Sequence, residues 1–86
     1  MTLEETLRTH VLSTCLPGED PDVLQPDDEL IDSGILDSLG IMQLVSLIER
    51  DFRISIPTED IDPEHFSSVR TLSAFVQRLL DQPRPG

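Results

Sequence analysis

"SLGIMQLVSLIERDF", residues 38–52, carries the strongest helical pattern of the chain. At 100° per residue, one face of this stretch is a continuous apolar stripe, formed by Ile41, Leu44, Val45, Ile48 and Phe52. Leu39 and Met42 lie off the centre of the stripe, and Leu47 lies nearly opposite it. We therefore predict a helix over residues 38–52 that is either central in a bundle or leaves apolar side chains for a partner.

Two further helices are predicted on either side of this one. In "TLEETLRTHVLSTC", Thr2 and Glu5 have the spacing of a capping box, and apolar residues recur every four positions, so we predict a helix over residues 3–15. In "SSVRTLSAFVQRLLDQ", residues 67–82, Ser67 or Ser68 can cap a last helix whose apolar face is Val69, Leu72, Val76 and Leu79.

The connections are long and contain apolar residues. Residues 16–37 include Pro17, Pro21 and Pro26, and a loop of this length is usually functional or disordered. We predict that its apolar residues fold it back onto the helices: Val23, Leu24, Leu30, Ile31, Ile35 and Leu36. Gly34 is expected to turn the chain with a positive φ. After the 38–52 helix, Ile54 and Ile56 are expected to point inward, and residues 58–66 to hold one short irregular helix.

Composition indicates a single small helical domain. The chain has 86 residues, 37% hydrophobic and 3% aromatic, with no Trp or Tyr. Aliphatic side chains must therefore fill the core, which suits a helical bundle better than a β-domain. We expect one domain over residues 1–82 and a frayed tail over residues 83–86, "PRPG".

The charge of the chain is strongly negative. The formal net charge is −11, all six bases are Arg, and no Lys or Arg lies between Thr9 and Glu49. Such a field repels nucleic acid and anionic membranes, and it attracts basic partners. The alternative is that the acids serve only to keep the protein in solution. The charge also favours a monomer.

Metal sites and targeting segments are not indicated. The single cysteine, Cys15, excludes an intramolecular disulfide and a cysteine-based zinc cluster, and it is expected to be a small buried residue at the end of the first helix. His10 and His65 are not in a metal-ligand spacing, and we expect both at the surface. No signal peptide or transmembrane run is present, so we expect a cytoplasmic protein without membrane insertion.

Ser38 lies at the start of the central predicted helix, and two roles are open to it. Its hydroxyl can cap the helix by accepting from a backbone N–H. It can also be a chemical handle, because a phosphodiester at a helix N-terminus lies in the favourable field of free N–H groups. A hydrolase is not indicated, since the sequence has no G-x-S-x-G elbow.

A family resemblance rests on the same region. "DDELIDSGILDSLGIMQLVSLIERDFRISIP", residues 27–57, resembles the centre of an acyl carrier protein, and the likeness extends over nearly the whole chain. The triplet Asp37-Ser38-Leu39 matches the site at which that family receives 4′-phosphopantetheine from coenzyme A. The resemblance implies an all-α fold, a four-helix bundle with three main helices, a short third helix and a long loop between the first two.

The resemblance also implies roles for individual residues. Ser38 would be the modified residue, and Asp37 would help the phosphopantetheinyl transferase to engage it. Leu39 and Met42 match apolar positions that family members offer to partner enzymes. The other residues expected to line this docking face are Gln43, Ser46 and Arg50.

The chain departs from carriers of fatty-acid synthases, because Gly40, Gln43 and Arg50 stand where those carriers often have acids. "GILDSLGIMQL" is most similar to freestanding carriers of the D-alanyl type, which an ATP-dependent ligase loads with an amino acid. We therefore expect a non-enzymatic carrier of an aminoacyl or other short polar group in a biosynthetic pathway. Its partners would be the transferase, a ligase or acyltransferase, and a downstream transferase or synthase. The alternatives are a polyketide or fatty acyl carrier and, more remotely, an unmodified helical adaptor.

Overall fold

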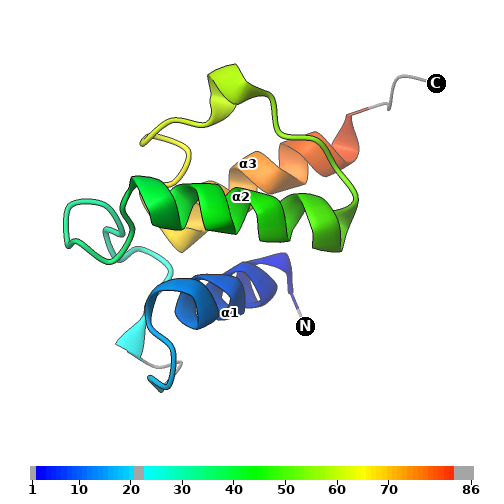
Figure 1. Ribbon diagram of the computed structural model, residues 1–86. Helices are drawn as coiled ribbons and strands as arrows, with labels where there is room; N and C mark the ends of the chain where they lie inside the picture. Colours follow the sequence, from blue (N-terminus) through cyan, green and yellow to red (C-terminus); the bar gives the residue numbers. More distant parts are fainter. Residues whose placement is uncertain (1, 21–22, 83–86) are drawn as a thin grey trace.

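Three α-helices form the framework of the protein, whose computed structural model describes residues 2–20 and 23–82 (Figure 1). They are α1 (Leu3–Cys15), α2 (Ser38–Phe52) and α3 (Val69–Asp81), and a short 3₁₀ helix, η2 (Thr58–Asp60), lies between α2 and α3. The predicted bounds of α1 and α2 are confirmed. The described residues contain no strand, which confirms the all-α class. None of the helices described is long and apolar enough to cross a bilayer.

The short irregular helix expected within residues 58–66 is present only as η2, and turns follow it up to residue 68. The described residues therefore hold three α-helices, and the expected count of four helices in the bundle is not confirmed. Pro63 explains the short length of this element. A residue before proline is disfavoured in the helical region, and proline has no N–H to donate, so a helix begun at Thr58 cannot continue through Asp62. Two backbone bonds hold the turn that remains, Asp60 N–H to Pro57 O (2.9 Å) and Ile61 N–H to Thr58 O (3.1 Å).

Local signals define the starts of α1 and α3. In the Thr2–Glu5 capping box, Thr2 Oγ1 accepts from the Glu5 N–H at 3.1 Å, and Glu5 Oε2 accepts from the Thr2 N–H at 3.4 Å. At α3 the cap is Ser68, whose Oγ accepts from the Thr71 N–H at 3.1 Å, so the choice between Ser67 and Ser68 is resolved. At the end of α2 only the conformation of the C-cap was not foreseen: Arg53 ends the helix in the left-handed region with φ 55°.

The core lies between the helices, and α1 packs against both α2 and α3. It comprises Leu7, Val11, Leu12, Leu24, Leu30, Leu36, Leu44, Val45, Ile48, Ile56, Phe66, Val69, Leu72, Phe75 and Val76. Ile41 and Phe52 of the predicted α2 stripe, with Leu79 of α3, are partly buried against this cluster. Aliphatic side chains thus fill most of the interior, as the composition predicts.

The long loop between α1 and α2 is anchored on the bundle by Leu24, Leu30 and Leu36, which are buried. Ile31 and Ile35 are partly buried beside them, whereas the prediction for Val23 is wrong, because its side chain is 50% exposed. The Leu30 N–H donates to Ser67 O at 2.8 Å, so the loop is joined to the segment that leads into α3.

A second contact joins the loop to the first turn of α3. The Arg70 N–H donates to Pro26 O at 2.9 Å, and the Arg70 Nε lies 2.6 Å from Asp27 Oδ1. Gly34 has φ 84°, which confirms the predicted turn just before α2. The loop therefore reaches the start of α2 along a path that buried leucines and α3 determine.

Both histidines are half-buried, so the expectation that they lie at the surface is wrong. His10 Nε2 lies 2.8 Å from Asp51 Oδ2, which links α1 to the end of α2. The ring of His65 stacks on Phe75 with 4.2 Å between centroids. Among the residues that the structure describes, no cluster of His, Cys, Asp and Glu is arranged to hold a metal ion.

Candidate functional site

The junction of the long loop with α2 is organised by Asp37. This residue has extended backbone angles and is the N-cap of α2: its Oδ1 accepts from the Gly40 N–H at 2.8 Å, and its carbonyl accepts from the Ile41 N–H at 2.8 Å. The first of the two roles considered for Ser38, the cap, is therefore wrong. Asp37 and Ser38 are both good capping residues, and the helix begins at Ser38, one position earlier than a Ser38 cap requires.

Ser38 is the first residue of α2, and its side chain is exposed. Within residues 2–20 and 23–82, no group hydrogen-bonds to its hydroxyl. The first N–H groups of a helix have no partner inside the helix. Here the Asp37 side chain accepts a hydrogen bond from only one of them, the Gly40 N–H. A phosphate on the Ser38 oxygen would lie beside the remaining N–H groups and the positive end of the helix, so these residues fit a phosphodiester-linked group.

Gly40 allows the junction to pack closely against α1. A Cβ at this position would lie 3.0 Å from Leu36 Cδ1, 3.3 Å from Asp37 Oδ1 and 3.5 Å from Cys15 Sγ. From the sequence, Gly40 stood out only because carriers of fatty-acid synthases often have an acid at this position. The structure gives it a packing role, because a larger residue would displace the loop residues that precede Ser38.

Cys15, the last residue of α1, is half-buried under this junction. Burial raises the pKa of its thiol, and the nearby Asp37 carboxylate raises it further. Since the thiolate is the nucleophile, Cys15 is a poor nucleophile near neutral pH. The only protein thiol near Ser38 is therefore kept protonated.

The residues expected to dock partners lie on one exposed face of α2, which we call the exposed stripe: Leu39, Met42, Gln43, Ser46 and Arg50. Their spacing of three and four residues places them on one side of the helix. Leu39 is 67% exposed and Met42 is 52% exposed, so α2 does leave apolar side chains outside the core.

The exposed stripe borders a surface groove of about 530 Å³ between α1 and α2. Besides three residues of the stripe, the groove is lined by Ser13, Thr14 and Leu47. Sequence reasoning missed Ser13 and Thr14, because no pattern within α1 indicates which of its polar residues face α2.

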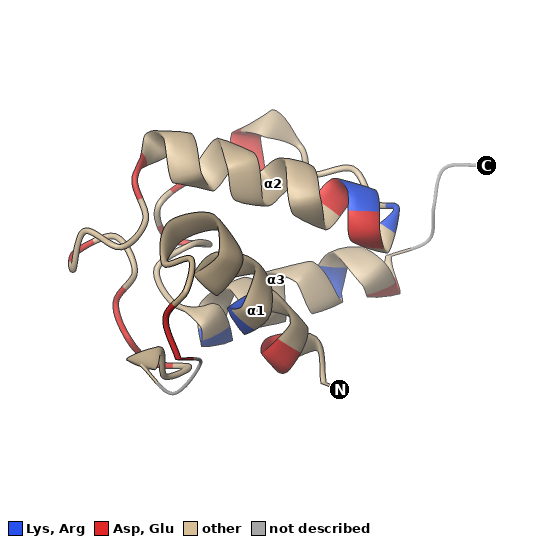
Figure 2. Cartoon of the chain, turned by 60° about the horizontal axis from the view of Figure 1, so that its bottom comes forward, with Lys and Arg blue, Asp and Glu red and all other residues tan. Residues whose placement is uncertain are grey.

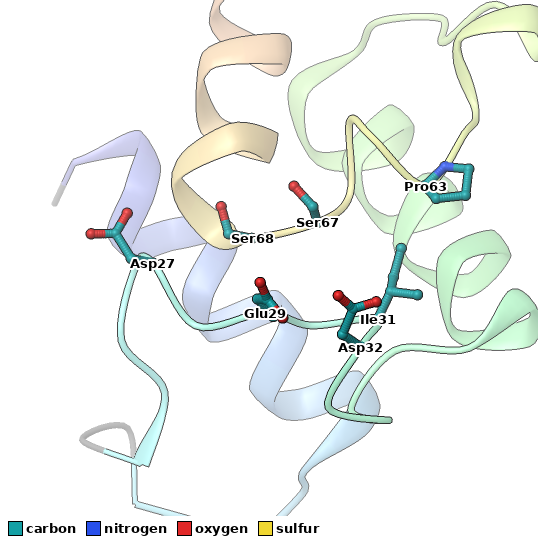
Figure 3. Close-up of a pocket in the computed structure, with 7 residues that line it drawn as sticks. All are labelled: Asp27, Glu29, Ile31, Asp32, Pro63, Ser67 and Ser68. Carbon is teal, nitrogen blue, oxygen red and sulfur yellow. The ribbon is translucent and has the colours of Figure 1, made fainter.

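A second hollow, of about 270 Å³, lies beside the second half of the long loop (Figure 3). It is lined by Asp27, Glu29, Ile31, Asp32, Pro63, Ser67 and Ser68. It thus lies between the loop and the segment before α3, and neither Ser38 nor any residue of the exposed stripe contributes to it.

Comparison with known proteins identifies relatives of the whole chain. A family model described as "Phosphopantetheine attachment site" matches residues 12–79. "Probable acyl carrier protein PigG" of Serratia sp. (strain ATCC 39006) is 34% identical over 98% of this chain and 95% of its own length. "D-alanyl carrier protein" of Streptococcus uberis is 34% identical over 62% of this chain and 67% of its own length.

Solved structures show the same likeness. The structure described as "KstB-PCP(apo)" superposes with a TM-score of 0.74 at 30% identity, over 95% of this chain and 90% of that one. A chain in "Crystal structure of FAD-dependent dehydrogenase" superposes with a TM-score of 0.73 at 35% identity, over 83% of this chain and 99% of that one. The chain therefore belongs to the family of carrier proteins that hold their cargo on covalently attached 4′-phosphopantetheine.

Proposed function

We propose that Ser38 is the residue that carries 4′-phosphopantetheine. The observation that supports this most directly is that the residue that caps α2 and the residue with the exposed hydroxyl are different residues. Asp37 caps the helix, so the neighbouring Ser38 hydroxyl is exposed and has no hydrogen-bond partner among the described residues. Ser38 also lies inside the region matched by the attachment-site family.

In this proposal the chain supplies the acceptor oxygen and the environment of the new phosphodiester. The Ser38 oxygen forms the bond to phosphorus as the pyrophosphate bond of coenzyme A breaks and adenosine 3′,5′-bisphosphate leaves. The proton of the hydroxyl passes to a base of the transferase. The N-terminus of α2 then stabilises the phosphate charge. When attached, the cofactor supplies a thiol that holds cargo as a thioester, and the chain itself performs no catalysis.

Intact mass spectrometry tests this assignment. We expect incubation with coenzyme A, Mg²⁺ and a broad-specificity phosphopantetheinyl transferase to add about 340 Da, the mass of one phosphopantetheine group. The gain should be absent in Ser38→Ala and present in Ser55→Ala, a matched exposed serine outside the helices. No gain in the wild-type chain, or a gain that survives Ser38→Ala, would refute the assignment.

For Asp37 we propose two roles. The capping geometry shows that it orients the first turn of α2. The family resemblance suggests in addition that its carboxylate helps the transferase to engage Ser38. Asp37→Asn separates these roles, since asparagine caps a helix about as well as aspartate but lacks the charge.

We propose an aminoacyl or other short polar group as cargo. The D-alanyl carrier relative supports this choice. Loading assays with amino acids and a cognate adenylating ligase, read as thioester mass, test the proposal. A polyketide or fatty acyl cargo would instead be loaded by an acyltransferase.

A flavin-dependent dehydrogenase is a further proposed partner. In the structure described as an FAD-dependent dehydrogenase, the matching chain is shorter than this one, because 83% of this chain covers 99% of it. A chain of that size is too short to form a dinucleotide-binding domain and a substrate domain. This supports a carrier bound beside a dehydrogenase, and we propose that this chain presents its thioester cargo to an enzyme of that class.

The whole of residues 1–82 is proposed as the carrier domain. The tail proposed for residues 83–86 lies outside the described residues. We further propose that the protein works in the cytoplasm, where coenzyme A is available, and that its net charge of −11 keeps it monomeric.

A further inference from the structure

The groove between α1 and α2 differs in charge from the rest of the protein. The net charge of the chain is −11, yet no acid is among the described residues that line the groove. Arg50 lies at the end farthest from Ser38, and the other lining residues are uncharged: Ser13, Thr14, Gln43, Ser46 and Leu47. Figure 2 shows charge on α2 only near its C-terminal end. The groove therefore suits a neutral ligand with hydrogen-bonding groups.

The polar side chains of this groove are available to a ligand. Within residues 2–20 and 23–82, the side chains of Thr14, Gln43 and Ser46 have no hydrogen-bond partner. The Ser13 hydroxyl donates to His10 O at 3.1 Å, and its oxygen can still accept. Ser13, Gln43 and Ser46 are exposed. Both walls of the groove, one from α1 and one from α2, thus present free amide or hydroxyl groups.

The arm that Ser38 is proposed to carry has the chemistry that this groove suits. Beyond its phosphate, pantetheine is neutral and consists of a hydroxyl group, two amides and a terminal thiol. Its amides and hydroxyl can donate to and accept from the side chains of both walls. The groove volume of about 530 Å³ is within the range of sites for small molecules, about 300–1,000 Å³. The arm therefore matches the groove in polarity and in size.

The length of the arm is sufficient to reach the groove from Ser38. Gln43 and Ser46 follow Ser38 by five and eight residues, which is about 7.5 and about 12 Å along the helix axis. They lie about 140° and about 80° around the helix from Ser38, so the path over the helix surface to either side chain is about 15 Å. An extended arm spans roughly 18 Å from the Ser38 oxygen to the sulfur, as its bond lengths dictate. Both residues are therefore within reach without any movement of the helices.

We propose that the groove between α1 and α2 binds the pantetheine arm when no partner enzyme is present. The amides of the arm bond to Gln43 and Ser46 on one wall and to Ser13 and Thr14 on the other. This inference rests on the proposed modification of Ser38. Because the arm is tethered, its effective concentration at the groove is on the order of millimolar, so a few weak hydrogen bonds are sufficient. A partner enzyme that binds the arm more tightly withdraws it from the groove.

Nuclear magnetic resonance of the modified carrier tests this site without any partner enzyme. The carrier is labelled with ¹³C and ¹⁵N and then modified with unlabelled coenzyme A, so that nuclear Overhauser effects between arm and protein can be selected. We expect such effects from the arm protons to the Thr14 methyl group and to the Gln43 side-chain amide. Gln77 is the internal control, because it is an exposed glutamine on α3, and we expect no effect at its side-chain amide.

A matched pair of variants provides a second measurement. In the wild-type chain, modification should shift the backbone amide signals of Ser13 and Thr14, which belong to a different helix from Ser38. Gln43→Ala removes one wall's amide and should reduce these shifts at least twofold. Gln77→Ala makes the same change on α3 and should leave them unchanged. Both glutamines are exposed, so neither substitution removes a core contact, and the spectra of the unmodified variants check that the fold is retained.

The outcomes separate this inference from the proposed function. If the wild-type chain gains no mass, or gains it away from Ser38, the attachment site is wrong and the inference fails with it. If Ser38 is modified but the arm shows no Overhauser effect to Thr14 or Gln43, the attachment site stands and the proposed groove is wrong. The groove is also wrong if the arm contacts α3 instead, or if Gln43→Ala and Gln77→Ala leave equal shifts at Ser13 and Thr14.

Discussion

The two ends of α2 differ in what their side chains do. At the N-terminal end, Ser38 and Leu39 are exposed and make no contact that the fold depends on. At the C-terminal end, Glu49 and Asp51 bind Ile56 and His10 and hold other segments in place. The exposed groups near Ser38 are therefore free for partners, whereas the two acids at the other end of α2 stabilise the fold.

Truncating a buried residue of α2 should have the largest effect on stability and show the contrast directly. Leu44 has no exposed surface, so Leu44→Ala should lower the free energy of unfolding by about 3 kcal/mol through lost burial and a residual cavity. Leu39→Ala, at the exposed end of the same helix, should change it by less than about 0.5 kcal/mol. Urea unfolding followed by circular dichroism measures both changes. Equal losses of unfolding free energy would contradict the difference between the buried and the exposed residues of α2.

Gly40 is expected to be the exception at the N-terminal end, since it is buried against the loop and α1. Gly40→Val should lower the free energy of unfolding by about 2 kcal/mol, because even the added Cβ comes within 3.0 Å of Leu36 Cδ1 and 3.3 Å of Asp37 Oδ1. Ser46→Val places the same side chain at an exposed position of α2 and should cost less than about 1 kcal/mol. Thermal unfolding of the two variants checks this, and a neutral Gly40→Val would show that the junction is loosely packed.

The cap is expected to contribute less. Asp37→Ala removes the acceptor of the Gly40 N–H and should cost about 1 kcal/mol of unfolding free energy, while Asp37→Asn should cost only a few tenths. Chemical denaturation measures the difference. If both substitutions cost the same, the carboxylate charge and not the hydrogen bond stabilises this end of the helix.

The smallest effect concerns the reactivity of Cys15. Burial raises the pKa of its thiol, so at pH 8 the thiolate fraction is smaller than in the unfolded chain, and alkylation by iodoacetamide should be slower in the folded protein than in urea. Reactivity in the folded protein should keep rising as the pH passes the ordinary cysteine range. Asp37→Asn should increase the rate slightly, because the carboxylate is the lesser of the two causes. Equal rates in native and unfolded protein would show that the thiol is not shielded.

Sequence patterns predicted the helices well where their signals are local. The apolar period and the Thr2–Glu5 capping box predicted α1, and the stripe of α2 predicted its bounds. The short helix expected within residues 58–66 is limited to η2, and this limit was missed because the pattern was weighed without the restriction that Pro63 imposes. Leu24, Leu30 and Leu36 were expected in the core, while Val23 was indistinguishable from them until the loop's path was known.

The candidate site, too, was predicted from the sequence only in part. The triplet Asp37-Ser38-Leu39 was sufficient to select Ser38, but its identity could not decide which of two good capping residues begins the helix. That choice depends on packing: Leu36 is buried and Gly40 approaches α1, and these contacts place Asp37 at the cap. Ser13 and Thr14 could not be found from sequence, since they approach α2 only across the groove.

By itself the sequence determined the helices, the apolar core residues within them and the serine at the head of α2, because each depends on neighbours a few positions away. Only the tertiary structure decided that Asp37 takes the cap, that Glu49 and Asp51 are occupied within the fold, and that Arg50 remains exposed. These features depend on side chains from segments distant in sequence, and a hydrogen bond or ion pair between such segments exists only once packing has brought them together.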